Sequence, residues 1–167
     1  YKEQGDWRTN AREQSTSILP AIYSCALAVT YEGHELRQAV ETLVTILNSH
    51  PDSVASAIAT AELLARSFNE TLEAAALLSC ASRLRQSYPQ ALSCANALET
   101  AVQLAENDEF WSHTAAQPLN LSPLQELSFA MALVLRHPEA LEDAVNLARA
   151  TTNSPAVMAL VAMLLGA

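Results

Sequence analysis

The stretch HPDSVASAIATAELLARS (residues 50–67) decides the fold of this chain. After Ser53 almost every position holds an apolar or small residue, so a helix built from this stretch would have no polar face. Such a helix is expected where other helices enclose it. Pro51 suits the first helical position, and Asp52 or Ser53 can cap the helix. We therefore expect a central helix that continues through Ser67.

Two helices are predicted before the central one. The first begins at Ser17, a capping residue with Pro20 close behind it, and ends at Gly33. The second covers His34 to Asn48, and its apolar residues recur three and four positions apart. This spacing places them on one face of a helix. The chain is therefore expected to be helical from Ser17 onward.

Five more helices are predicted after the central one, and four of them start at a proline. Proline is favoured at the first helical position, where its missing N–H costs nothing. The acidic stretch ENDEFWSHTAAQPLN (residues 106–120) lacks a helical pattern and is expected to be irregular. The five helices are expected from Thr71 (after a cap at Asn69) to Gln86, from Pro89 to Ala105, from Ser122-Pro123 to Arg136, from His137-Pro138 to Ala150, and from Ser154-Pro155 onward.

The composition favours the same fold class. Half of the residues are hydrophobic, Ala and Leu dominate, and only 3 are Gly. Ala and Leu lose little freedom in a helix, whereas strands favour β-branched and aromatic residues. The prediction is all-α: a single compact domain of about eight helices over residues 17–167, after a polar N-terminal segment over residues 1–16. The alternative is a tandem-helix solenoid, because the His-Pro-acid sequence at His50 recurs at His137, but a solenoid would show more than two copies.

The net charge and the cysteines limit the expected cellular location and the classes of binding partner. The formal net charge is -9, from 9 Lys and Arg against 18 Asp and Glu, which disfavours nucleic acid and anionic bilayers as partners. The longest apolar stretch, residues 156–167, is too short to span a membrane, so no membrane insertion is expected. The three cysteines, Cys25, Cys80 and Cys94, occupy apolar helical positions and are expected to be buried, reduced and inert. A cytoplasmic location is therefore predicted.

The order of several segments resembles a known family. These segments are ILPAIYSCALAV (residues 18–29), LRQAVETLVTIL (residues 36–47), SHPDSVASAIATAELLA (residues 49–65) and the closing sequence from LQELSFAMALVL to MLLGA (residues 124–167). Together they resemble the C-terminal half of the ADP-ribosylglycohydrolase family. The resemblance implies that family's helical fold, with the helix after His50 at its centre.

The family's metal site is degenerate in this sequence. The resemblance implies two magnesium ions, held by an early Thr-Asp-Asp motif and a late Asp-x-Asp-Thr turn, because hard divalent cations need clustered oxygen ligands. No Thr-Asp-Asp occurs here. The late turn is represented by Thr152, Asn153 and Ser154, and no register of it supplies a carboxylate. We expect no catalytic residue, no bound metal and no cofactor; magnesium would be needed only if the chain were active.

Other motifs have ordinary explanations. His34-Glu35 begins like a zinc-protease motif, but Gln38 stands where the second His belongs. The acidic residues around His113 lack the glycine-pivoted loop of an EF-hand and favour a solvated loop. Phe110 and Trp111 are the more informative pair. They are expected either to fold back onto the domain, which is favoured, or to form a partner-contact loop.

These observations favour a non-catalytic, ADP-ribosylglycohydrolase-like helical domain, a pseudoenzyme that acts as a protein-interaction or assembly module. Its partner would be another protein or a second copy of the chain, since the sequence ends on bare apolar residues. The alternative is a fragment or subunit of a magnesium-dependent ADP-ribosylglycohydrolase whose N-terminal metal-binding half is missing here. A third hypothesis is a helical scaffold unrelated to the family, because alanine-rich helices match one another easily.

Overall fold

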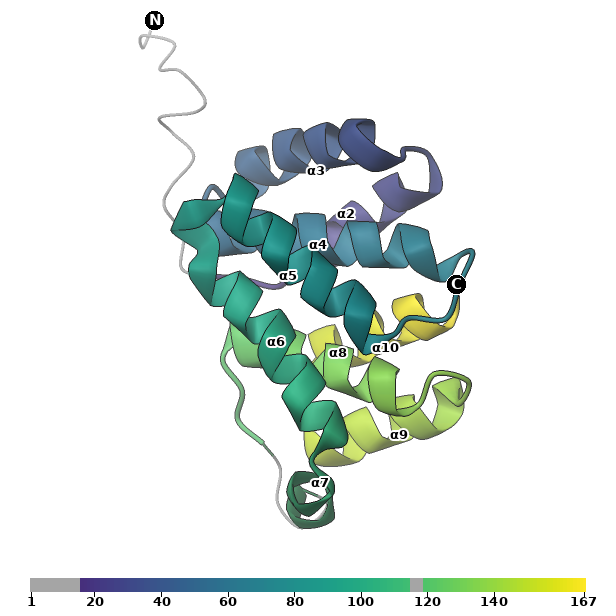
Figure 1. Ribbon diagram of the computed structural model, residues 1–167. Coiled ribbons are helices and arrows are strands. Elements are labelled where there is room, and N and C mark those ends of the chain that lie inside the picture. Colours follow the sequence, from purple (N-terminus) through teal and green to yellow (C-terminus); the bar gives the residue numbers. More distant parts are fainter. Residues whose placement is uncertain (1–15, 115–118) are drawn as a thin grey trace, which may run out of the picture.

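The computed structural model describes residues 16–114 and 119–167, and in these residues the chain is all-α, as predicted (Figure 1). The predicted polar segment lies outside the described residues except for Thr16. In the described part, the β structure is limited to one isolated bridge between Leu119 and Thr152. Residues 16–114 and 119–167 form nine α-helices and two 3-10 helices: α2 (Leu19–Ser24), η1 (Cys25–Val29), α3 (Gly33–Leu47), α4 (Pro51–Ser67), α5 (Ala74–Ser87), η2 (Pro89–Ala91), α6 (Leu92–Glu106), α7 (Asp108–Thr114), α8 (Pro123–Arg136), α9 (Leu141–Thr151) and α10 (Pro155–Leu165).

Helix α4 is enclosed by its neighbours, as its composition predicts. It packs against α2, η1 and α3 on one side and against α5, α6 and α10 elsewhere. Every residue from Asp52 to Leu64 is buried except Glu62. Most of the buried residues are Ala, Ser or Thr, whose small side chains let neighbouring helices approach closely. The fold is therefore a compact domain arranged around one helix.

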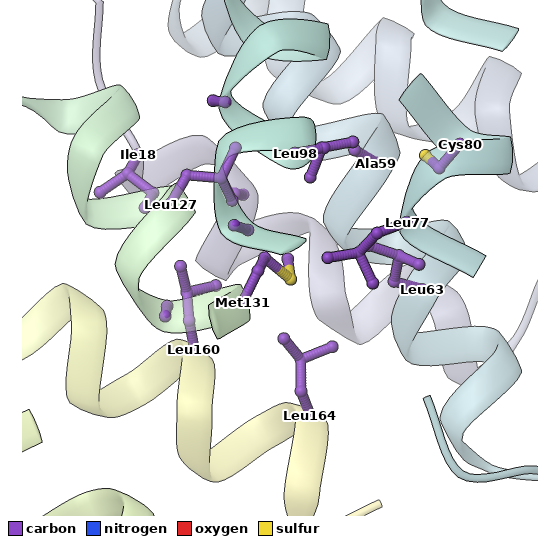
Figure 2. Packing of buried hydrophobic residues seen from close by; sticks show 14 of the residues in the cluster. Ile18, Ala59, Leu63, Leu77, Cys80, Leu98, Leu127, Met131, Leu160 and Leu164 are labelled. Carbon is purple, nitrogen blue, oxygen red and sulfur yellow. The ribbon is translucent and has the colours of Figure 1, made fainter. Parts of the chain in front are cut away.

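The large side chains of the core come from the helices around α4. Leu127 and Met131 of α8 face the α10 residues Leu160 and Leu164 (Figure 2). Leu98 of α6 lies beside Ala59 of α4, and Leu77 packs where α5 meets α4 (Figure 2). Leu98, Leu127 and Met131 are fully buried. Helices α6 and α8 form the most extensive pair, and α9 and α10 cover the other side of α8 (Figure 1). Among the described residues no helix has both the length and the apolar character needed to cross a bilayer.

The start of α4 differs from the prediction that Asp52 or Ser53 caps it. The N-cap is His50, whose Nδ1 accepts a hydrogen bond from the Asp52 backbone N–H at 3.2 Å. The Asp52 carboxylate instead accepts from the Cys94 backbone N–H at 3.2 Å, and Ser53 Oγ accepts from the Ser17 N–H at 2.9 Å. The Asp52 side chain thus satisfies an N–H in the first turn of α6, and the Ser53 side chain satisfies one just before α2, because buried N–H groups need partners. The prediction failed because α4 is crowded by neighbours that compete for its polar side chains.

Two predicted helix boundaries are also wrong. The stretch predicted to be irregular contains α7, which forms because Asn107 Oδ1 accepts from the Phe110 N–H at 3.0 Å and orders the first turn. Helix α9 starts at Leu141 and not at the predicted Pro138. His137 instead closes α8, since its N–H donates to Leu133 O at 3.0 Å. Proline is common one or two residues after the end of a helix as well as at a helix start.

Smaller differences affect two other helices. The first predicted helix is divided, because the chain tightens from α2 into the 3-10 helix η1 at Cys25. Helix α5 begins at Ala74, three residues beyond the predicted Thr71. The predicted caps at Ser122 and Ser154 are confirmed: Gln125 Oε1 accepts from the Ser122 N–H at 2.9 Å, and Ser154 Oγ accepts from the Val157 N–H at 3.3 Å.

The interface between α6 and α8 predicts a contrast between two leucines of α6. Leu98 is fully buried there, whereas Leu92 is 50% exposed. Leu98→Ala is expected to lower the free energy of unfolding by about 2–5 kcal/mol, because it leaves a cavity in the core. Leu92→Ala should cost less than about 1 kcal/mol. Urea denaturation followed by circular dichroism measures both, and equal losses would contradict this packing.

Candidate functional site

The turn of Thr152, Asn153 and Ser154 serves the ends of two helices. Thr152 is buried and its Oγ1 donates to Ala148 O in α9 at 3.0 Å. Ser154 caps α10, and Asn153 is exposed. The N–H of Leu119 donates to Thr151 O at 2.7 Å, which holds the turn from the other side. Two of the three side chains therefore have a structural role that explains their identity.

Phe110 and Trp111 lie on α7 and not in a loop. Trp111 is buried, and its indole N–H donates to Leu104 O at 2.6 Å. Its ring centroid lies 5.3 Å from that of Phe129, and the Arg136 guanidinium lies 5.6 Å from it. Trp111 is thus folded back onto the domain and Phe110 is partly buried beside it, while a role of the pair in contacting a partner stays a prediction.

The cysteines and the acidic stretch show no site chemistry. All three cysteines are buried, as expected, and burial raises the pKa of Cys25 to about 11 and that of Cys80 to about 12. These thiols stay protonated near neutral pH and are poor nucleophiles. Asp108 forms an ion pair with Arg136 at 2.7 Å. In residues 16–114 and 119–167, no three His, Cys, Asp or Glu side chains converge as metal ligands would.

Among the described residues, one hollow lies on each side of α3. The first, which we call the arginine pocket, has a volume of about 670 Å³. It lies where the start of α3 faces the second half of α4, and α5 contributes one side chain. Its charged lining residues are Glu32, Arg37, Glu62, Arg66, Glu70 and Arg83. The described residues contain six arginines and no lysine, so half of their cationic side chains converge on this pocket.

Glu62 is the centre of the charge arrangement in the arginine pocket. Its side chain is only 12% exposed, and its two oxygens contact different arginines. Arg37 Nε lies 2.5 Å from Oε1, as an ion pair without the N–H···O angle of a hydrogen bond. Arg83 Nη2 donates to Oε2 at 2.8 Å, and this hydrogen bond raises the pKa of Arg83. One carboxylate on α4 thus ties α3 to α5.

The remaining charges sit at the edge of the arginine pocket. Arg66 Nε donates to Glu70 Oε1 at 2.6 Å, in an exposed pair one helical turn apart. Glu32 is exposed and has no ion-pair partner among the described residues. Next to it Gly33 has a φ of 54°, a left-handed conformation that favours glycine and lets the chain turn sharply into α3. The edge of the pocket near α3 therefore carries a carboxylate without an ion-pair partner among the described residues, whereas the edge near α4 carries the ion pair of Arg66 and Glu70.

The second hollow, which we call the α3 groove, is mainly apolar. It has a volume of about 650 Å³ and runs between η1 and the outer side of α3. Its apolar lining residues are Leu27, Tyr31, Ala39, Leu43 and Ile46. Ile46 is 58% exposed, although α3 buries Leu36, Val40 and Val44 on its inner face. Helix α3 therefore carries two apolar stripes, of which only one is covered by α4.

Analysis of the sequence missed both hollows, although signals for them exist. Glu62 is the one acidic residue in the second half of an otherwise apolar helix, and a lone carboxylate there needs a cationic partner. Arg37 and Arg83 lie 25 residues before it and 21 residues after it, so only the packing of three helices brings them together. The extra apolar residues of α3, Leu43 and Ile46, were visible as a broad apolar arc on one helix.

Because Glu62 contacts two arginines, its substitution by Gln should destabilise the domain more than the same substitution of Glu70. Glu62→Gln removes the only negative charge between Arg37 and Arg83, and should lower the free energy of unfolding by about 1–3 kcal/mol. Glu70→Gln breaks an exposed pair and should cost less than about 0.5 kcal/mol. Chemical denaturation at pH 7 measures both. If the two variants are equally stable, Glu62 does not hold the three helices together.

Comparisons with known proteins identify no relative of this chain. No protein-family model, no curated protein and no solved structure matches it. The resemblance to the ADP-ribosylglycohydrolases is neither supported nor contradicted by these comparisons and stays a prediction. The function has to be inferred from the geometry of the domain.

Proposed function

We propose that this chain is a non-catalytic protein-interaction module that binds an amphipathic helix of a partner protein in the α3 groove. The observation that carries the proposal is the second apolar stripe of α3, which no other described helix covers. Leu43 and Ile46 are separated by almost one helical turn and face the same hollow as Tyr31. A hollow lined in this way suits the apolar face of a helix, with side chains three and four positions apart.

The charge around the α3 groove indicates which charge the polar face of the partner helix should carry. Glu35 is the only ionisable acid or base lining the groove apart from Tyr31. The groove lies in a chain with a net charge of -9. A basic partner would be attracted over the distance of a Debye length, whereas an acidic one would be repelled. The expected partner segment is therefore a helix with an apolar face and Lys or Arg residues along its edges.

The test uses a synthetic 18-residue peptide of Leu and Lys, with the leucines on one helical face, labelled for fluorescence anisotropy. Ile46→Asn should weaken its binding about tenfold, because a half-exposed isoleucine that becomes buried contributes about 1.5 kcal/mol. The matched control is Leu92→Asn on α6. Leu92 is exposed to a similar extent, but it lies outside the groove. Neither substitution changes the net charge.

Two outcomes would contradict the α3 groove proposal. Equal weakening by Ile46→Asn and Leu92→Asn would mean that the peptide binds the acidic surface without a defined groove. Equally tight binding of a scrambled peptide with the same composition would mean that only charge matters. A titration in rising salt separates the two contributions, since the apolar part of the affinity persists at high ionic strength.

We also propose that the domain derives from an ADP-ribosylglycohydrolase-like ancestor and has lost catalysis. The order of its segments and the enclosed helix α4 support this descent, and the turn of Thr152, Asn153 and Ser154 offers no carboxylate. Calorimetric titration with magnesium in the presence of ADP-ribose is expected to give no saturable heat, because neutral ligands cannot compensate for the lost hydration of the ion. Saturable binding would instead support the alternative, a fragment of an active hydrolase.

A further inference from the structure

The arginine pocket contains cationic donors that its own carboxylates do not satisfy. Two guanidinium groups, those of Arg37 and Arg83, share the single carboxylate of Glu62. Arg66 is occupied by Glu70. The Arg83 Nε atom is buried without a hydrogen-bond partner in the described part of the chain, whereas Arg37 Nε lies against Glu62 Oε1 in the ion pair. A buried donor such as Arg83 Nε is normally hydrogen-bonded in proteins.

Arg37 has the donors that a ligand could reach. Its side chain is 37% exposed, and neither of its Nη atoms donates a hydrogen bond within residues 16–114 and 119–167. Arg83 uses one Nη for Ser79 Oγ at 3.0 Å and the other for Glu62. The two Nη groups of one guanidinium form a planar fork that matches the two oxygens of a carboxylate. Arg37 therefore lines the pocket with two Nη groups that are not used within the described residues.

The rest of the lining limits the ligand to a small, partly apolar molecule. Val29, Leu36 and Phe68 line the same hollow, and Val29 and Phe68 are exposed there. Glu32 is unpaired at the edge and would repel a second negative charge on the ligand. A volume of about 670 Å³ suits a molecule of small-ligand size. A phosphate dianion fits these features worse than a monoanion with an apolar body.

We propose that the arginine pocket binds a monocarboxylate attached to a compact apolar group, such as the C-terminal residue of a peptide or a short free acid. The Arg37 fork would receive the carboxylate, while Val29 and Phe68, which are exposed in the pocket, would contact the apolar group. Glu62 and Arg83 are positioning residues, because their ion pairs hold the Arg37 side chain in place. This site is separate from the α3 groove and does not depend on the function proposed for it.

The test is a titration of isotope-labelled protein followed by NMR. N-acetyl-leucine serves as the probe for a peptide C-terminus, and hexanoate as the probe for a free acid. Either probe should shift the amide signals of Gly33 and Arg37. Tighter binding of N-acetyl-leucine would indicate a peptide C-terminus as the ligand, and tighter binding of hexanoate would indicate a free acid. N-acetyl-leucine amide, which lacks the charge, and inorganic phosphate, which lacks the apolar group, should each bind at least about fivefold more weakly.

Three variants connect the binding to the pocket residues. Arg37→Gln should weaken N-acetyl-leucine about fivefold or more, because the fork is lost while Glu62 keeps Arg83 as its partner. Glu32→Gln should strengthen it about twofold by removing a repelling charge. Arg85→Gln is the matched control, since Arg85 pairs with Glu99 outside the pocket. Thermal unfolding of each variant shows that the fold is retained.

Several results would overturn the proposal. Binding of the amide as tight as that of the acid would reduce the pocket to an apolar hollow. Binding of phosphate as tight as that of N-acetyl-leucine would make it a general anion site. No shift at Gly33 or Arg37 with either acid at 20 mM, about the weakest affinity of interest for a small probe, would remove the site. If Arg37→Gln proves unstable, an unchanged affinity in Glu32→Gln would still contradict the assignment.

Discussion

The enclosure of α4 is the constraint on which the rest of the structure depends. A helix of Ala, Ser, Ile and Leu with no polar face is stable only when neighbours remove it from water on all sides. Here α2, η1, α3, α5, α6 and α10 bury α4 from Asp52 to Leu64, apart from Glu62. The small residues of α4 let these neighbours approach closely, while large residues such as Leu98, Leu127 and Met131 fill the space between the outer helices.

The position of Glu62 follows from this enclosure. A carboxylate on a nearly buried helix loses much of its hydration, and it is stable only with cationic partners close by. Arg37 from α3 and Arg83 from α5 supply them, so the two helices are fixed on either side of one carboxylate. The same arrangement leaves three arginines around one hollow and turns the second apolar stripe of α3 outward. Both proposed binding surfaces are therefore consequences of how α3 is held against α4.

The predicted site residues show what local sequence can and cannot indicate. Trp111 was correctly expected to fold back onto the domain, because a large aromatic residue gains most from burial. The turn of Thr152 to Ser154 contains no carboxylate, which the sequence alone shows, and the structure adds that Thr152 and Ser154 serve helix ends. The arginine pocket could not be predicted, since its charged residues come from three helices and their distances depend on how those helices pack.

The sequence alone determined most of the helices, though not α7 or the start of α9, because helical periodicity, proline starts and the apolar stretch after Ser53 are local features of the chain. It also determined that α4 is central, since its composition leaves no face for water. Only the tertiary structure decided which polar groups meet: Asp52 with the start of α6, Ser53 with Ser17, and Glu62 with two arginines. The physical reason is that a side chain's partner is set by burial and distance in space, and many arrangements of the same helices would satisfy the same periodicity.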